Sequence, residues 1–341
     1  MKGLKLVKLL TPLLIILSMV FGISFIVQQV EAKSDTKFIL DNATGGDCIL
    51  IGSWDSITKT CVLTNDLTGA IQIYGNGLTL DGAGHTIKGI GYGTGVYVHE
   101  RVGVTIKNLN VKNFKIGIFL YSSSGNIITD NIVNENNWYG IYLDSSSNNN
   151  IITNNTANSN RNFGIYLHTS SNNDLTGNIA NLNVQYGIYL FASSNNNILT
   201  NNIAYGNRYG IYLFAYSNNN ILSSNIVSSN GYGIYLHTSS INDLTGNVII
   251  ENKNVGIVLV SSNNNKVYSN NFINNPSQAV VRSSNDNVFT LAAPIGGNYW
   301  SNYDTGSKGC IDSDSDGFCD ALFVFRGGQD NLPWHRDGWA S

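Results

Sequence analysis

Four aspartates surround a glycine near the C-terminal end of the chain, at a spacing that suits a hard metal ion. Asp312, Asp314 and Asp316 occupy alternate positions, and Gly317 follows them and allows a sharp turn. Three such carboxylates before a glycine form the first half of a calcium-binding loop, because Ca²⁺ takes oxygen ligands. We expect calcium to bind there in a structural role, through a ligand set made of Asp312, Asp314, Asp316, the backbone carbonyl of Phe318, and Asp320.

The alternative for this segment is a solvated acidic turn that holds no ion. The twelfth position of the loop is Phe323, where a helix-loop-helix calcium site has glutamate, so the pattern is incomplete. Copper is not expected as a cofactor, because soft copper ligands are methionine and cysteine. Both methionines, Met1 and Met19, lie in the N-terminal segment.

A second set of reactive side chains directly follows copies of a repeated tetrapeptide, Gly-Ile-Tyr-Leu or a close variant. If successive copies stack, these side chains form one column, with neighbours about 4.8 Å apart. Histidine beside a carboxylate and a tyrosine could provide a base, an orienting group and an acid for elimination or epimerisation of a uronic acid. The candidate catalytic residues are His99, Tyr121, Asp144 and His168.

Repeat duplication is the competing explanation for these histidines. His168 and His237 begin near-duplicate segments, residues 168–177 and 237–246, and copying alone would produce both. The catalytic interpretation is therefore the minor one.

The tyrosine of the tetrapeptide forms a second column. Alternation along a strand would place isoleucine and leucine on one face and tyrosine on the other. An outward tyrosine stripe could stack on sugars or could only stabilise the sheet. The candidate carbohydrate-binding residues are Tyr142, Tyr166, Tyr189, Tyr212 and Tyr235.

The tetrapeptide repeats impose the fold that positions all these residues. Copies start at Gly95, Gly117, Gly140, Gly164, Gly187, Gly210, Gly233 and Gly256, with a decayed copy at Gln278, and successive starts are 22 to 24 residues apart. This period is too short for a pair of helices, and the segments are β-branched, aromatic and Asn-rich. About seven or eight regular coils of three short strands each predict an all-β, right-handed, single-stranded parallel β-helix.

Two series of asparagines recur with the same period. One runs through Asn131, Asn155, Asn178, Asn202, Asn225, Asn247 and Asn271, and the other follows five residues later, from Asn136 to Asn252. We expect stacked asparagine ladders at the turns between strands.

The two ends of the solenoid must be capped, because its terminal strands would otherwise be unpaired. We expect a signal peptide in 1–32, an N-terminal cap and irregular coils in 33–94, regular coils in 95–290, and a C-terminal cap in 291–341. The N-terminal segment has Lys2, Lys5 and Lys8 before a long apolar run, and an uncleaved anchor is the alternative. Local cysteine pairs predict two disulfides, Cys48–Cys61 and Cys310–Cys319.

The coils resemble the NosD-like, carbohydrate-binding-and-sugar-hydrolase class of β-helix proteins. The resemblance rests on the Asn-rich Gly-Ile-Tyr-Leu coils, on residues 297–303 (Gly-Asn-Tyr-Trp-Ser-Asn-Tyr) and on the Asp-rich loop, and it covers nearly the whole mature chain. It implies three classes of function: periplasmic accessories to copper-enzyme maturation, polysaccharide lyases, hydrolases or epimerases, and surface proteins.

Among these classes we favour an exported surface or periplasmic protein that binds a glycan or has a structural role. The partner would be a polysaccharide or cell-surface glycan. The formal net charge of −3 argues against nucleic acid as a partner, and no segment after the first 32 residues is expected to cross a membrane. A polysaccharide-modifying enzyme is the first alternative, and a NosD-type copper accessory is the second.

Overall fold

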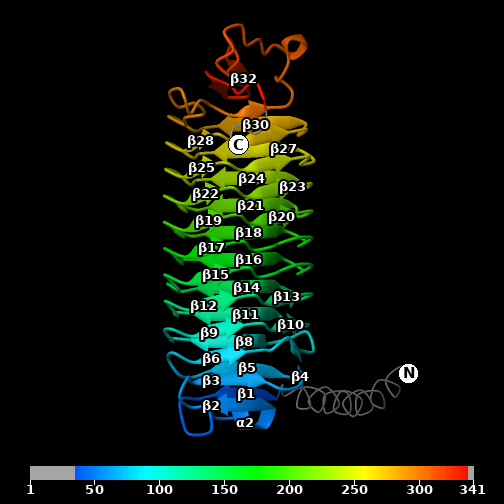
Figure 1. Ribbon diagram of the computed structural model, residues 1–341, viewed down its shortest axis with the longest axis vertical. Coiled ribbons are helices and arrows are strands. Elements are labelled where there is room, and N and C mark those ends of the chain that lie inside the picture. Colours follow the sequence, from blue (N-terminus) through cyan, green and yellow to red (C-terminus); the bar gives the residue numbers. More distant parts are fainter. Residues whose placement is uncertain (1–34, 337–341) are drawn as a thin grey trace, which may run out of the picture. The chain divides into compact units, whose positions relative to one another are not determined.

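The repeated tetrapeptides form the strands of one long parallel sheet, here called sheet A. The computed structural model describes residues 35–336, and Figure 1 shows the strands of this sheet stacked from β1 to β30. Its strands, in spatial order, are β1 (Thr36–Ile39), β5 (Ala70–Ile73), β8 (Thr94–His99), β11 (Ile116–Tyr121), β14 (Tyr139–Asp144), β16 (Phe163–His168), β18 (Tyr186–Phe191), β21 (Tyr209–Phe214), β24 (Tyr232–His237), β27 (Val255–Val260) and β30 (Ser277–Arg282).

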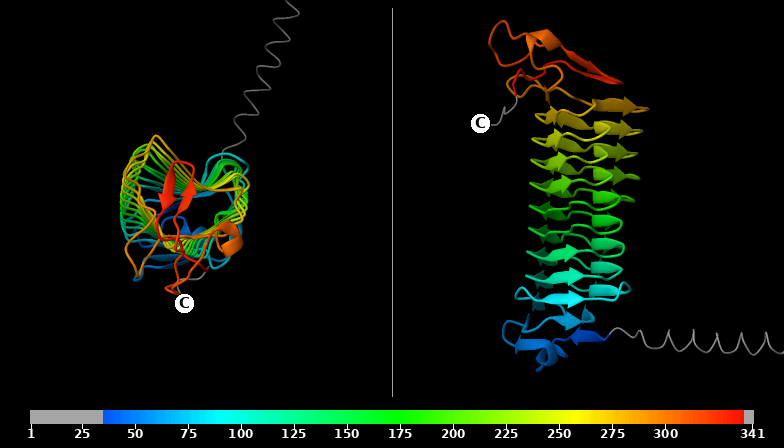
Figure 2. Two further views of the ribbon diagram at one scale, coloured as in Figure 1. Left: turned by 90° about the horizontal axis from the view of Figure 1, so that it is seen from above. Right: turned by 90° about the vertical axis from the view of Figure 1, so that its right-hand side faces the viewer.

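Two further stacks complete each coil, so that a view along the axis shows strands arranged around a central core (Figure 2). Sheet B contains β2 (Gly52–Asp55), β3 (Thr60–Leu63), β6 (Thr79–Asp81), β9 (Thr105–Lys107), β12 (Ile127–Thr129), β15 (Ile151–Thr153), β17 (Asp174–Thr176), β19 (Ile198–Thr200), β22 (Ile221–Ser223), β25 (Asp243–Thr245) and β28 (Lys266–Tyr268). Sheet C has one part with β4 (Leu67–Thr68), β7 (Thr86–Lys88), β10 (Asn110–Lys112) and β13 (Ile132–Asn134), and another with β20 (Ile203–Tyr205), β23 (Ile226–Ser228), β26 (Val248–Ile250), β29 (Asn271–Ile273) and β31 (Tyr299–Trp300).

Equivalent residues of successive coils pair directly, as the period predicts. Tyr166 is the partner of Tyr189, and Leu167 is the partner of Leu190. The inward side chains of sheet A are fully buried, as expected for Ile165, Leu167, Ile188 and Leu190, each 0% exposed. The apolar core therefore runs along the axis inside the coils, and the side chains of equivalent residues lie in straight columns.

The glycine of the tetrapeptide interrupts the strict alternation of side chains along each strand of sheet A. Between β16 and β18, Phe163 pairs with Tyr186 and Ile165 pairs with Ile188, and the register of this ladder skips the glycine between them, Gly187. A Cβ atom at Gly187 would lie 2.6 Å from the carbonyl oxygen of Gly210, so only glycine fits against the inner side of the next coil. As a result, the residue before the glycine turns to the outer face, where Tyr186 stacks on Tyr189.

Buried asparagines connect the coils at the turns. In the ladder that contains Asn155 and Asn178, the backbone N and Nδ2 of Asn155 both donate to Oδ1 of Asn178, at 3.0 and 3.1 Å. Nδ2 of Asn155 also donates to the carbonyl of Ile128 at 2.8 Å. Each side chain thus satisfies backbone groups that the turn would otherwise leave buried without partners.

Three asparagine ladders are present, one more than the sequence predicts. The additional ladder runs through Asn126, Asn150, Asn173, Asn197, Asn220, Asn242, Asn265 and Asn287. The assignment of Asn271 was wrong, because Nδ2 of Asn247 donates to Asn270. Asn271 instead lies in β29, where it is the register partner of Val248 in β26, at an outward position of sheet C.

Both ends of the solenoid carry a disulfide, which confirms the two predicted pairs. Cys48, in the short helix α2 (Cys48–Ile51), is bonded to Cys61 of β3, and Cys310 is bonded to Cys319.

The segment expected to be the N-terminal cap supplies β1 to β7 to the same three stacks. The predicted signal segment, 1–32, lies outside the described residues. Within residues 35–336, no helix has the length and apolar character needed to span a membrane.

The C-terminal cap is organised around a buried carboxylate. It includes the 3₁₀ helix η1 (Gly306–Lys308) and the hairpin of β32 (Phe323–Phe325) and β33 (Gly328–Asp330), which Figure 1 shows beyond β30. Asp330 is 0% exposed and accepts hydrogen bonds from the backbone of Asn298 at 2.7 Å and from Nε1 of Trp300 at 2.8 Å. Asn298 is also the last member of an asparagine ladder, so this carboxylate connects the cap to the coils.

Candidate functional site

The outer face of sheet A carries three parallel columns of side chains, most of them aromatic. The leading column, just before the glycines, is Tyr139, Phe163, Tyr186, Tyr209 and Tyr232. The central column, at the tyrosine of the tetrapeptide, is Tyr97, Phe119, Tyr142, Tyr166, Tyr189, Tyr212 and Tyr235. The trailing column, after the tetrapeptide, is His99, Tyr121, Asp144, His168, Phe191, Phe214 and His237. Together they form the candidate site, here called the aromatic face.

Rings of the central column stack on one another along the axis. The ring centroids of Tyr142 and Tyr166 are 4.7 Å apart with an interplanar angle of 4°, and those of Tyr166 and Tyr189 are 5.1 Å apart at 9°. The series ends at Tyr235, whose ring is turned by 84° relative to that of Tyr212. Both faces of the inner rings are therefore covered by neighbouring rings.

This stacking decides how a ligand could contact the tyrosines predicted to bind carbohydrate. Tyr166, Tyr189 and Tyr212 are buried, with 8%, 8% and 9% exposed surface, and the leading column packs beside them. A sugar could not stack on their faces and would instead meet ring edges and hydroxyl groups. Tyr142 and Tyr235 are more open but belong to the same cluster. Carbohydrate binding by these five tyrosines stays a prediction.

Burial also fixes the protonation state of the tyrosine hydroxyls. Desolvation raises the pKa of Tyr166, Tyr189 and Tyr212 well above the ordinary value of 10.0. For Tyr142 burial again contributes most to the raised pKa, and the hydrogen bond to Asp144 adds to it. The hydroxyls of the central column consequently remain neutral hydrogen-bonding groups near pH 7.

Two of the four candidate catalytic residues are joined by a hydrogen bond. Nδ1 of His168 lies 2.7 Å from Oδ1 of Asp144, and the hydroxyl of Tyr142 donates to Oδ2 of the same carboxylate at 2.8 Å. The backbone N of Ser145 donates to Oδ1 at 2.6 Å. The imidazole also stacks on Phe191, with centroids 5.3 Å apart. The carboxylate thus orients the ring through Nδ1, and Nε2 is the ring nitrogen that this contact does not engage.

The other two candidates lie nearer the N-terminal end of the same column. Tyr121 is the register partner of both His99 and Asp144, and its ring contacts His99 edge-on, with centroids 5.2 Å apart. The side-chain hydroxyl bonded to Asp144 is that of Tyr142 and not that of Tyr121. The four residues therefore form a column as expected, and the Asp144–His168 pair is its hydrogen-bonded part.

Sequence reasoning missed the leading column and the role of Tyr142 beside Asp144. Strict alternation assigns the residue before each glycine to the inside, whereas the interruption at the glycine turns it outward. The recurrence of tyrosine or phenylalanine at all five positions was the available signal, since equivalent aromatic residues at a fixed period indicate stacking.

The Asp-rich loop is a separate feature of the C-terminal cap. One oxygen each from Asp312, Asp314 and Asp320 lie within 4.8 Å of one another. Asp316 is outside this group, and its carboxylate accepts a hydrogen bond from the backbone N of Phe318 at 2.8 Å. Within residues 35–336, this is the one group of three or more histidine, cysteine or acidic side chains close enough to share an ion.

Two family models match the chain. One is described as the right-handed beta helix region and matches residues 39–180 and 69–225, which together span more than half of the chain and confirm the predicted fold. The other is described as periplasmic copper-binding protein (NosD) and matches residues 186–305. These matches confirm the resemblance inferred from the coils. No curated protein matches the chain.

Several solved structures have a similar fold. The A-module of the mannuronan C-5 epimerase AlgE6 from Azotobacter vinelandii is 14% identical, with a TM-score of 0.51 over 75% of this chain and 94% of that chain. The Dettilon tailspike protein is 17% identical, with a TM-score of 0.48 over 71% and 58%. The periplasmic alginate epimerase AlgG is 17% identical, with a TM-score of 0.42 over 69% and 79%. At these identities the similarity concerns the fold alone.

Proposed function

The chain belongs to the right-handed β-helix family, and from this premise we propose that it is an exported protein whose aromatic face binds a polysaccharide. Export is supported by the apolar N-terminal segment and by the two disulfides, which persist in oxidising compartments. The observation that carries the binding proposal is the continuous row of tyrosine rings on the outer side of sheet A, from β14 to β24.

The chemistry of this surface suits a glycan better than a charged polymer. From β14 to β24 the three columns contain fifteen side chains, five per column, of which Asp144 is the one acid and none is lysine or arginine. Tyrosine combines apolar ring edges with a hydroxyl group, and sugars combine apolar C–H patches with hydroxyl groups. The contacts would therefore be hydrogen bonds and edge packing, with little dependence on salt.

A glycan array with the purified protein tests this proposal. Tyr186→Phe combined with Tyr209→Phe removes two hydroxyls from the leading column and retains the stacked rings. We expect this double variant to bind its glycan about tenfold more weakly, the loss expected for one or two hydrogen bonds. Tyr205→Phe is the matched control, because Tyr205 is exposed and belongs to sheet C.

Two results would count against binding at the aromatic face. One is a wild-type protein that retains no glycan on the array. The other is a double variant that binds as tightly as the wild type.

A second function, modification of a uronic-acid polysaccharide, is favoured by the hydrogen bond between His168 and Asp144. With Nδ1 held by the carboxylate, Nε2 could remove the proton at C5 of a uronic acid, and Asp144 would stabilise the imidazolium that forms. The AlgE6 A-module is an epimerase of mannuronan by its name, but its similarity extends only to the fold, so this candidate depends on the two side chains.

Product analysis after incubation with uronate polymers tests the second function. Turnover that disappears in His168→Phe and in Asp144→Asn would support it. Turnover that is unchanged when both residues are replaced would exclude this pair as the catalytic site.

A further inference from the structure

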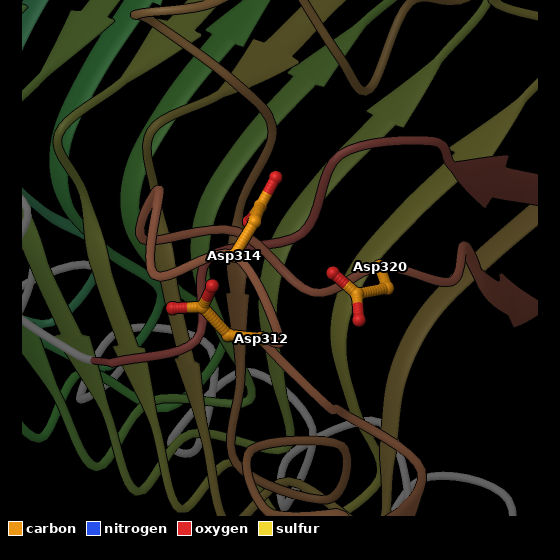
Figure 3. A group of neighbouring side chains, drawn as sticks. All are labelled: Asp312, Asp314 and Asp320. Atoms are coloured by element: carbon orange, nitrogen blue, oxygen red, sulfur yellow. The ribbon is translucent and has the colours of Figure 1, made fainter.

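The Asp-rich loop of the C-terminal cap brings three carboxylates close together. The loop between η1 and β32 carries Asp312, Asp314 and Asp320, and Figure 3 shows the three side chains projecting from this one segment. One carboxylate oxygen from each lies within 4.8 Å of the other two. Three like charges at this separation repel one another unless a cation or protons intervene.

An independent observation indicates that a ligand belongs here. The side chain of Asp312 is only 10% exposed. Its Oδ2 accepts a hydrogen bond from the backbone N of Gly317 at 3.2 Å and lies 3.7 Å from Nδ1 of His335, whereas its Oδ1 is buried with no hydrogen-bond partner among the described residues. A buried carboxylate oxygen without a donor is costly, and a bound cation would satisfy it.

The loop already holds the other two carboxylates in place. Oδ1 of Asp314 accepts a hydrogen bond from the backbone N of Asp316 at 3.3 Å. Asp320 accepts hydrogen bonds from the backbone N and from Oγ of Ser313, the latter at 2.6 Å. The Cys310–Cys319 disulfide closes the loop around these residues. Such preorganisation reduces the entropy that a ligand must overcome.

We propose that this loop binds one calcium ion through Asp312, Asp314 and Asp320. Carboxylate oxygens are the ligands of a hard cation, and Ca²⁺ tolerates the irregular geometry of a loop better than Mg²⁺ does. The proposed set differs from the one derived from the sequence in two ligands. It leaves out the backbone carbonyl of Phe318 and the carboxylate of Asp316, which is engaged by the backbone N of Phe318 and lies outside the group.

The ion would fix the cap over the last coil. The loop is joined to the segment 333–335 by two backbone hydrogen bonds, from Cys319 to the carbonyl of Pro333 at 2.9 Å and from His335 to the carbonyl of Gly317 at 3.0 Å. Trp334 in turn donates its backbone N–H to the carbonyl of Asn298 at 3.0 Å. Closing the loop on an ion would therefore stabilise the contact between the cap and the last asparagine of its ladder.

Isothermal titration of the chelator-treated protein with CaCl₂ tests the site directly. We expect one ion per chain in the wild type, a higher Tm in the presence of CaCl₂, and weaker binding of MgCl₂. Asp314→Asn should weaken calcium binding by about tenfold or more, since affinity depends on the number of charged ligands. Asp314 is the variant of choice because it is exposed and has a single weak hydrogen bond.

The matched control is Asp286→Asn, which makes the same charge change at an exposed turn before the cap. It should bind calcium as the wild type does. A wild-type chain that binds no calcium would overturn the proposal whatever the variants do. Equal affinity in Asp314→Asn and wild type, with both folded by circular dichroism, would also overturn it, and tighter binding of Mg²⁺ would overturn the choice of ion.

Discussion

Nδ1 of His168 lies 2.7 Å from Oδ1 of Asp144, although the two residues are separated by a full coil of the chain. Both belong to the trailing column of sheet A, where the period places equivalent residues next to each other. The pair therefore follows from the parallel stacking of β14 on β16 and not from proximity in the sequence.

This pairing predicts an energetic coupling between the two residues. Asp144→Asn and His168→Phe should each reduce the free energy of unfolding, and the double variant should lose less than the sum. We expect a coupling energy of about 0.5 to 1 kcal/mol, as for solvent-accessible ion pairs, because the imidazole is a third exposed. Urea denaturation of the four proteins measures it.

Asp174→Asn with His237→Phe is a suitable control pair, because these residues lie on different sheets and share no contact. Their effects should add. Strict additivity for Asp144 and His168 would show that the contact contributes nothing to stability.

The buried tyrosines of the central column predict a loss of stability at alkaline pH. Their folded-state pKa values are raised by burial, while the same side chains in the unfolded chain ionise near 10.0. For a group with a raised folded pKa, the stabilisation is complete below the unfolded pKa and is lost as pH rises above it. The free energy of unfolding should therefore fall steadily above about pH 10.

Parallel spectrophotometric and circular-dichroism titrations check this prediction. The tyrosinate absorbance of the buried central-column tyrosines should appear together with the loss of the β-sheet signal. A single absorbance phase near the ordinary tyrosine pKa, with the sheet signal intact, would contradict it.

The fold could be predicted from the sequence because it depends mainly on the period of the repeat, which can be read directly along the chain. A fixed period shows which residues lie above one another, and the alternation of Ile188, Tyr189 and Leu190 shows which of them face the core. The trailing column also followed from the period alone. Assigning Asn271 to a ladder failed because Asn270 and Asn271 are adjacent, and only the strand register separates the ladder position from the outward position.

Other features depend on backbone detail and rotamers, which a period does not determine. The leading column exists because a glycine that must fit against the next coil interrupts the alternation before Tyr186. The contact between Tyr142 and Asp144 depends on the direction of a hydroxyl along the column. In the Asp-rich loop, Asp316 turns back to its own backbone, a local competition that residue spacing cannot reveal.

We predict that removing one buried amide from an asparagine ladder strongly lowers the free energy of unfolding. Oδ1 of Asn202 accepts hydrogen bonds from the backbone N and the Nδ2 of Asn178, and its Nδ2 donates to the carbonyl of Leu175. Asn202→Ala would leave these groups without partners, at a cost of about 3 kcal/mol or more. Chemical denaturation measures the loss, and the exposed Asn65→Ala should stay within about 0.5 kcal/mol of the wild type. Equal stability of the two variants would contradict a stabilising role for the ladder.

Because the carboxylate of Asp330 is buried and hydrogen-bonded within the C-terminal cap, we predict that the stability of the cap depends on this residue. It accepts hydrogen bonds from Thr290, Asn298, Trp300 and Leu332, at 2.6 to 3.1 Å. Asp330→Ala would leave buried donors unpaired and should lower the free energy of unfolding by about 3 kcal/mol or more.

Because the indole of Trp300 is one of those donors, its fluorescence should report the change. The loss should persist in excess calcium, since Asp330 lies outside the three carboxylates of the proposed ion site. Hydrogen exchange should become faster first in β31 of the cap and in β29, the strand that pairs with it, while β14 to β21 stay protected, because each coil of a solenoid contacts only its neighbours. Uniformly faster exchange along all coils would instead mean that the cap and the solenoid unfold as one cooperative unit.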